Sequence, residues 1–331
     1  QSPSSAASDV YKRQTMGRVA LPELRRMGYS GSLSTGALAA GGTLGILIPP
    51  SVILIIYSIL TEQNIAKMFL AAFVPGILAA IGYLIAIAIF VRIKPDSGPP
   101  TSYVGWRQRL NLFGQVWQIL VIFFLVIGGI YLGWFTPTEG ASIGAAGTGI
   151  MALFTKGFNF SDLIDVIKDT AVTSAMIFLV LLGAEFFNSF IALTQITNEL
   201  ATFVISNELS PYLVVFCILV LYILLGCLMD SLAMILLTIP VFFPIIIELD
   251  FGMSIEEVAI WFGILTLIVV EVGLITPPVG LNVFIINKMA KNVPISDTFI
   301  GVLPFLISDL IRVGILFIFP GISLFLIRLF G

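Results

Sequence analysis

The sequence contains no histidine, and only 11% of its 331 residues are charged. Histidine is the commonest metal ligand and the usual general base near neutral pH, so its absence leaves little basis for acid–base catalysis or a transition-metal site. The two cysteines, Cys217 and Cys227, lie in one apolar run and too far apart along a helix to form a disulfide. We interpret them as small apolar side chains. The net charge of −3 gives no reason to expect a nucleic-acid partner.

Apolar residues, by contrast, make up 58% of the chain. Runs such as 119–132 and 212–229 have the apolar content of membrane-spanning helices rather than of soluble core helices. The composition therefore predicts an all-α integral membrane protein whose surroundings include a lipid bilayer.

Glycine, proline and polar clusters divide the apolar runs into a series of expected helices. The expected elements are a broken helix at 34–60, helices at 65–91, 110–134, 138–154 and 163–193, a polar interfacial stretch at 194–207, two apolar arms at 212–229 and 231–247, a broken helix at 258–289 and a last span at 300–329. A proline-containing linker occupies 95–109.

One motif occurs twice and interrupts an apolar run each time. The two copies read GGTLGILIPPS (Gly41–Ser51) and EVGLITPPVGLN (Glu271–Asn282). Proline removes a backbone donor and glycine tolerates irregular backbone, so each copy is expected to unwind a transmembrane helix. A pair of interrupted segments in two halves of a chain is the best sequence indication of a transporter's binding site.

Basic and acidic loops alternate along the chain, which predicts its topology. The positive-inside rule places the basic loops, including the 95–109 linker, in the cytoplasm and the acidic loops outside. Acidic loops flank both arms around Asp230, so the arms must enter and leave on the same side. We therefore expect 212–247 to form a re-entrant hairpin with its tip near 228–231.

The two breaks also anchor a longer repeat. The distance from Pro50 to Pro75 nearly equals that from Pro278 to Pro304, and 1–94 corresponds roughly to 229–331. The charge topology gives the two copies opposite orientations, which predicts an inverted repeat.

The repeat also predicts a domain organisation. Segment 15–94 ends the first repeat, 110–207 supplies scaffold helices of the second, and 208–331 forms its transport part. The first repeat has no counterpart of the scaffold, so we expect the chain to be N-terminally truncated. Residues 1–14 are expected to be a foreign remnant near the first hairpin, because charged residues stand where an apolar arm should begin.

Five segments together resemble one family. They read LAAGGTLGILIPPSVILIIYS (Leu38–Ser58), FLAAFVPGIL (Phe69–Leu78), TPTEGA (Thr136–Ala141), GCLMDSLAMILLTIPVFFP (Gly226–Pro244) and GLITPPVGLNVF (Gly273–Phe284). This order and spacing resemble the large membrane (permease) subunit of tripartite ATP-independent periplasmic (TRAP) transporters.

The resemblance implies an elevator-type fold of the ion-transporter superfamily, with re-entrant hairpins, in the bacterial inner membrane. It implies sodium-driven import of organic acids, such as C4-dicarboxylates, sugar acids or keto acids. The implied partners are a small four-helix membrane subunit and a periplasmic substrate-binding protein. Sodium is the implied coupling ion, and no cofactor is expected.

In this family, sodium sites form where hairpin tips meet the unwound helices. Exposed carbonyls there can hold a cation, and amides at a half-helix start favour a carboxylate. Substrate and ion binding is expected at Asp230, Ser231, Thr276, Gly280 and Asn282 in the second site, and at Ser5, Gly42, Thr43, Gly45 and Ser51 in the first. Among these, the resemblance assigns Na⁺ to Ser231, Thr276 and Asn282 in the second site and to Thr43 and Ser51 in the first. The first hairpin tip departs from the family's Gly-Ser-Ser. Backbone at both breaks is expected to be held open by Pro49, Pro50, Pro277 and Pro278.

Simpler interpretations exist for several of these residues. Hydroxyl groups beside a break can bond carbonyls of their own helix, and Asp230 can cap the second arm instead of binding an ion. Glu271 either tunes the second ion site or faces the interface. Asp309 and Arg312 stand three apart on one helix, which favours a mutual ion pair.

Three other functions are compatible with parts of the pattern. A single-component sodium/carboxylate symporter of the same broad fold would need no binding protein. An intramembrane enzyme would have to act through Asp230 or Ser231 without histidine or paired catalytic aspartates, so we predict that the chain is not an enzyme. A passive channel fits poorly with closed hairpins against broken helices.

Overall fold

The computed structural model describes residues 7–99, 105–154, 158–290 and 292–330. The described part is helical and contains no strand, as the composition predicts. Clustering of contacts divides the chain into two compact units, 1–99 with 176–331, and 100–175. The boundary between the units falls inside helix α7 (Phe160–Thr194).

The smaller unit contains α5 (Trp106–Tyr131), α6 (Pro137–Phe154) and the first part of α7. A tight turn joins α5 to α6 with Gly133 at φ +70°, a conformation that glycine adopts without strain. Glu139 completes the start of α6, because its carboxylate accepts hydrogen bonds from the backbone N–H and the hydroxyl of Thr136. The helices expected at 110–134 and 138–154 are thus confirmed.

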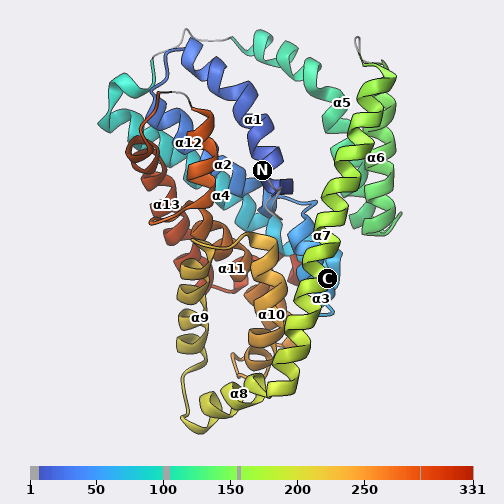
Figure 1. The fold of residues 1–331 in the computed structure, drawn as a ribbon, viewed down its shortest axis with the longest axis vertical. Helices are drawn as coiled ribbons and strands as arrows, with labels where there is room; N and C mark the ends of the chain where they lie inside the picture. Colours follow the sequence, from blue (N-terminus) through green and yellow to red (C-terminus); the bar gives the residue numbers. More distant parts are fainter. Residues whose placement is uncertain (1–6, 100–104, 155–157, 291, 331) are drawn as a thin grey trace. The chain divides into compact units, whose positions relative to one another are not determined.

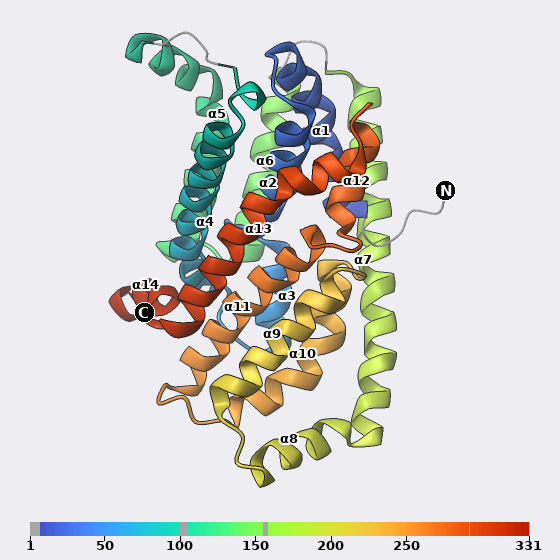
Figure 2. The ribbon, with the colours of Figure 1, turned by 90° about the vertical axis from the view of Figure 1, so that its left-hand side faces the viewer.

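The larger unit holds the remaining elements, which Figures 1 and 2 show from two sides. They are α1 (Ala7–Arg26), α2 (Gly31–Leu47), α3 (Val52–Leu60), α4 (Ile65–Ile93), η1 (Pro95–Ser97), the end of α7, α8 (Ile196–Ser206), α9 (Pro211–Gly226), α10 (Ser231–Ile247), α11 (Ile255–Ile275), α12 (Leu281–Met289), α13 (Ile295–Ile318) and α14 (Gly321–Phe330).

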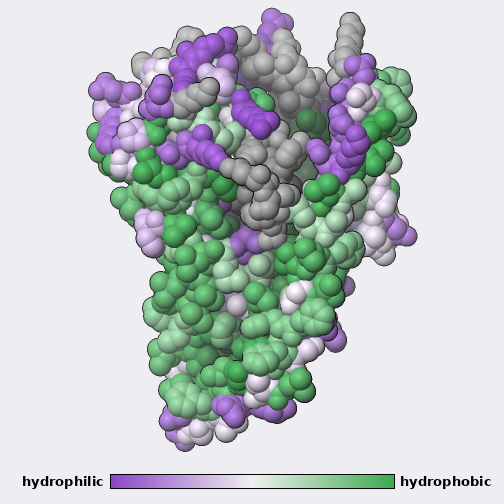
Figure 3. Space-filling model, in the orientation of Figure 1, coloured by the Kyte–Doolittle hydropathy of each residue, from purple (hydrophilic) through white to green (hydrophobic). Residues whose placement is uncertain are grey.

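Four of the described helices are long and apolar enough to cross a membrane: α4, α7, α11 and α13. The pair α2 and α3 passes the same test as one span bent by 45°, which makes up to five. Hydrophobic side chains also cover the visible face over α9 and α10 (Figure 3). Large exposed apolar residues are the expected surface of a protein in lipid.

Helix α11 is the core of the larger unit. Every residue from Val258 to Ile275 is buried, and α9, α10 and α13 pack around it. Trp261 donates its indole N–H to the Leu316 carbonyl at 2.9 Å and stacks on Phe317. Tyr57 of α3 donates its hydroxyl to the Ala259 carbonyl at 2.7 Å. Both polar groups of these large buried side chains are therefore satisfied inside the protein, as an apolar environment requires.

Helices α2 and α13 cross at two glycines. A Cβ at Gly36 would overlap the Gly301 backbone, and a Cβ at Gly301 would overlap the carbonyl group of Ser32. Hydrogen bonds continue the contact beside the crossing, where the Thr35 hydroxyl donates to that of Thr298 at 3.0 Å. Close approach of small residues with hydrogen bonds between helices is a common way of joining helices in membranes.

Hydrogen bonds and ion pairs join segments that lie far apart in the sequence. The loop before α2 bonds to the linker through Ser30 N–H and the Ser97 carbonyl. Lys67 pairs with Glu256 at 2.7 Å, and Arg328 pairs with Glu257 at 2.7 Å. The membrane topology expected from the charge pattern stays a prediction.

Two expected boundaries need comment. The expected last span, 300–329, is wrong as a single helix, because α13 ends at Ile318 and α14 begins at Gly321. Pro320 lacks the N–H that a continuous helix would use and disfavours helical backbone at Phe319. Helix α1 runs through the expected boundary at residue 14, and the suggested foreign origin of 1–14 stays a prediction.

Gly301→Ala is expected to lower the midpoint of thermal unfolding of the purified protein in detergent. The added methyl group must push α13 away from α2, and overpacking of this kind costs about 1–3 kcal/mol. Gly314→Ala in the same helix is the control, since its Cβ would meet no atom within 4 Å. Equal midpoints for the two variants would contradict the close crossing.

Candidate ion and substrate site at the helix breaks

The second break separates α11 from α12 by an extended turn. Thr276 ends α11 in extended conformation, Pro277 and Pro278 are exposed, and Gly280 begins α12 at φ +59°. The left-handed backbone explains the glycine at 280, because a Cβ there would be strained. The Pro277–Pro278 peptide bond is cis, as is the Pro49–Pro50 bond of the first break. The unwinding expected from the sequence is present in the structure at both places.

The tip of the α9–α10 hairpin packs against this break. A Cβ at Gly273 of α11 would lie 2.6 Å from the Cα of Gly226, so the two backbones touch. The Cys227 thiol lies 3.7 Å from the Pro277 carbonyl. Figure 2 shows the tip of the hairpin beside the junction of α11 and α12. The hairpin tip and the unwound helix thus lie against one another, although they are far apart in the sequence.

Asp230 caps helix α10. Its Oδ1 accepts hydrogen bonds from the backbone N–H groups of Leu232 at 2.9 Å and Ala233 at 3.2 Å. A carboxylate at this position also complements the positive end of the helix dipole. The capping role considered from the sequence is therefore present, and it holds the tip of the hairpin in its turn.

Ser231, the first residue of α10, donates its hydroxyl to the Glu271 carboxylate at 2.5 Å. Both residues are 2% exposed. The sequence left open whether Glu271 faces the interface or the ion site, and the structure places it at the hairpin tip. Because the hydroxyl hydrogen points at the carboxylate, the lone pairs of Ser231 Oγ are left to accept or to coordinate.

From the sequence, Glu271 either tunes the second ion site or faces the interface, and it is not among the residues expected to bind the ion. A signal was present, because Glu271 is an acid one turn before the end of an otherwise apolar stretch of α11.

The remaining expected residues of the second site also lie at the break. Asn282 is fully buried in the first turn of α12, and the Thr276 hydroxyl donates to the Val272 carbonyl at 2.6 Å. Thr276 thus bonds a carbonyl of its own helix, which is the simpler of the two roles that the sequence allows for this residue.

The first break has the same construction on α2 and α3. Ile48 closes α2, and the Ser51 side chain caps α3 by accepting from Leu54 N–H at 3.4 Å. Thr43 is 1% exposed, and its hydroxyl lies 2.6 Å from the Ala40 carbonyl and 3.0 Å from the Tyr83 hydroxyl.

The other expected members of the first site are less constrained. A Cβ at Gly45 would meet no atom within 4 Å, and Gly42 is partly buried. Ser5, expected at the first hairpin tip, lies outside the described residues.

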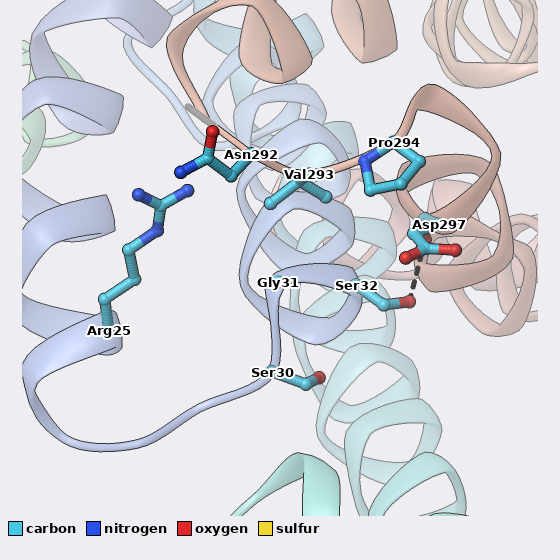
Figure 4. Close-up of a pocket in the computed structure, with 8 residues that line it drawn as sticks. All are labelled: Arg25, Ser30, Gly31, Ser32, Asn292, Val293, Pro294 and Asp297. Atoms are coloured by element: carbon cyan, nitrogen blue, oxygen red, sulfur yellow. Dashed lines mark hydrogen bonds between the residues drawn. The ribbon is translucent and has the colours of Figure 1, made fainter.

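A separate pocket opens between the loops that precede α2 and α13 (Figure 4). Arg25 and Asn292 extend toward one another on one side, and Ser32 donates its hydroxyl to the Asp297 carbonyl at 2.7 Å on the other. The residues around it come from 25–32 and 292–297, so it contains no residue of either break.

The chemistry of both breaks is that of oxygen ligands. The second break offers hydroxyl, amide and carboxylate oxygens from Ser231, Asn282 and Glu271. The first break offers hydroxyl oxygens from Thr43 and Ser51. In the described part of the chain, histidine, cysteine, aspartate and glutamate form no group of three that could hold a metal ion. Such oxygen sites suit hard cations, and the N-terminus of α12 suits an anion.

A protein-family model described as the DctM component of the tripartite ATP-independent periplasmic transporter matches residues 4–322. The chain belongs to this TRAP transporter family. The resemblance drawn from the Gly/Pro motifs is thereby confirmed, and so is the prediction that the chain is not an enzyme. Members of the family are transporter permease subunits, and the apolar helices agree with a multi-pass membrane protein.

Two curated relatives illustrate the match to the TRAP family. The C4-dicarboxylate TRAP transporter large permease protein DctM of Pseudomonas aeruginosa is 32% identical, over 93% of this chain and 70% of the relative. The sialic acid TRAP transporter permease protein SiaT of Haemophilus influenzae is 30% identical, over 94% of this chain and 49% of the relative. The chain thus spans about half the length of the second protein.

Proposed function

We propose that this chain is the transmembrane subunit of a sodium-coupled secondary importer of organic acids in the bacterial inner membrane. Relatives named for C4-dicarboxylate, sialic acid and isethionate transport support the class of substrate. Each of these compounds carries a carboxylate or sulfonate group, so an anion site is the common requirement. The partners are a periplasmic binding protein, which makes the first selection, and a small four-helix membrane subunit.

The observation that carries this proposal is the buried Ser231–Glu271 hydrogen bond at the second break. A cation leaving water for an apolar site needs oxygen ligands and a compensating negative charge. Ser231 Oγ, the Thr276 region and the Asn282 amide supply the oxygens, and Glu271 supplies the charge. We assign the second sodium ion to this group.

The substrate's acidic group then binds beside the ion. The positive end of α12 begins at Gly280, and the N-terminus of a helix favours an anion. Sodium and the organic acid neutralise one another there, which lowers the electrostatic cost of moving both through the membrane. In this account the α9–α10 hairpin and the broken helices travel together, as in an elevator-type carrier.

Sodium coupling is tested by uptake into liposomes that contain the chain with its two partner components. Radiolabelled succinate, N-acetylneuraminate and pyruvate are supplied with an inward sodium gradient or with choline. We expect one of these acids to accumulate only with sodium and with its binding protein. Equal uptake in choline would refute the coupling, and uptake without binding protein would favour a single-component symporter.

Ser231→Ala, Asn282→Ala and Glu271→Gln are each expected to raise the sodium concentration for half-maximal uptake by about tenfold. Each change removes a ligand oxygen or the compensating charge, at a cost of about 1.5 kcal/mol or more. Glu256→Gln is the matched control, because Glu256 is an acid at the other end of the same helix, in an exposed ion pair worth little. Sodium titrations identical to wild type in all three variants would reject this ion site.

A further inference from the structure

A buried ion pair lies away from both breaks, on α13. Arg312 donates to Asp309 Oδ1 at 2.7 Å, and the two side chains are 6% and 2% exposed. The guanidinium Nε and Nη1 have no hydrogen-bond partner in the described part of the chain. Burying two charges costs several kcal/mol per ion, and replacing such a pair by apolar residues is often neutral or stabilising. The pair is therefore poorly explained by stability alone.

The second oxygen of this aspartate binds a tyrosine of another helix. Tyr83 of α4 donates its hydroxyl to Asp309 Oδ2 at 2.7 Å, and its ring packs edge-on against Phe305 at 5.1 Å. Helix α4 touches α13 closely here, since a Cβ at Gly82 would overlap the Ser308 hydroxyl. A hydrogen bond to an ionised acceptor is roughly twice as strong as a neutral one, so the Tyr83 hydrogen is committed to the carboxylate.

The chain of contacts then reaches the first break. The Thr43 hydroxyl donates to the Ala40 carbonyl at 2.6 Å, and Tyr83 OH lies 3.0 Å from Thr43 Oγ1, where either hydroxyl could be the donor. Three contacts connect these groups with Asp309, but the two hydroxyls supply only two hydrogens. With the Tyr83 hydrogen on Asp309, the single Thr43 hydrogen is contested by the Tyr83 oxygen and the Ala40 carbonyl. When Thr43 donates its hydrogen to Tyr83 instead, no hydrogen lies between Thr43 Oγ1 and the Ala40 carbonyl oxygen.

The second break shows the same arrangement in a shorter form. There the Ser231 hydroxyl donates directly to the Glu271 carboxylate. At both breaks a buried hydroxyl group is therefore connected to a buried carboxylate. At the second break Ser231 contacts Glu271 directly, and at the first break Tyr83 connects Thr43 with Asp309.

We propose that Tyr83 and the Asp309–Arg312 pair are positioning residues for the first ion site, which draw the Thr43 hydrogen toward Tyr83 and leave Thr43 Oγ1 free to coordinate sodium. Arg312 keeps the Asp309 carboxylate in place and acceptor-only, and Tyr83 carries its effect to the broken helix. This inference rests on the proposed sodium coupling and assigns a role to polar residues outside either break.

The test is a double-mutant cycle read out as the sodium concentration for half-maximal uptake. Tyr83→Phe keeps the ring packing and removes the hydroxyl, and we expect it to raise that concentration about fivefold to tenfold. Thr43→Val should raise it at least as much, and Tyr83→Phe should add nothing in the Thr43→Val background, since Tyr83 acts only through the Thr43 hydroxyl. Thr43→Ser keeps the hydroxyl and should stay near the wild-type value.

Tyr57→Phe is the matched control, because it also removes a buried tyrosine hydroxyl, one that binds the Ala259 carbonyl instead. It should leave the sodium titration unchanged. An unchanged titration in Tyr83→Phe, or additive effects of Tyr83→Phe and Thr43→Val, would overturn the inference while leaving the proposed function intact. Sodium-independent uptake by the wild type would instead refute the proposed function itself. Sodium-dependent thermal stabilisation of each purified variant gives a second readout that does not require transport.

Discussion

The structure around both breaks depends on one constraint, which is that polar groups in an apolar environment must find partners inside the protein. Each unpaired backbone group in hydrocarbon costs roughly several kcal/mol, so a helix can be interrupted at depth only where other groups compensate. The second break meets this requirement with the hairpin tip, which packs through Gly226 and Gly273 and is itself held by the Asp230 cap. The first break meets part of it with the Ser51 cap on α3. Each break in a helix is therefore accompanied by groups that cap it or pack against it.

The same constraint applies to the buried charged side chains, which also need partners inside the protein. The central helix α11 is fully buried from Val258 to Ile275, and its acid Glu271 binds the first residue of the hairpin arm. Among the described residues the other buried charges are Asp309 and Arg312, which are connected to the first break through Tyr83. In the proposed carrier these two carboxylates have different roles. Glu271 supplies the negative charge beside the second ion, whereas Asp309, whose charge is balanced by Arg312, positions hydroxyl groups.

Much of the fold was predictable because proline, glycine and apolar runs act locally. The Pro-Pro pairs mark both breaks correctly. The prediction of one continuous helix over 300–329 was wrong, although Pro320 in the sequence indicates an interruption there.

The site was less predictable, because its members meet through long-range packing. Thr43, Ser231 and Asn282 could be proposed from their nearness to a break. The contacts Ser231–Glu271 and Tyr83–Asp309 join residues 40 and 226 positions apart, and no local pattern encodes them. The roles of Glu271 and Tyr83 therefore required the structure.

The central claim is that sodium binds at the breaks beside hydroxyls that carboxylates orient. The most direct measurement is a high-resolution cryo-electron microscopy structure of the complete transporter in saturating sodium, compared with one in choline. The account predicts sodium-dependent density between the α9–α10 tip and the second break, coordinated by Ser231 Oγ, and a second density near Thr43 Oγ1. Identical maps in the two salts, with Ser231 and Thr43 contacting only protein, would contradict it.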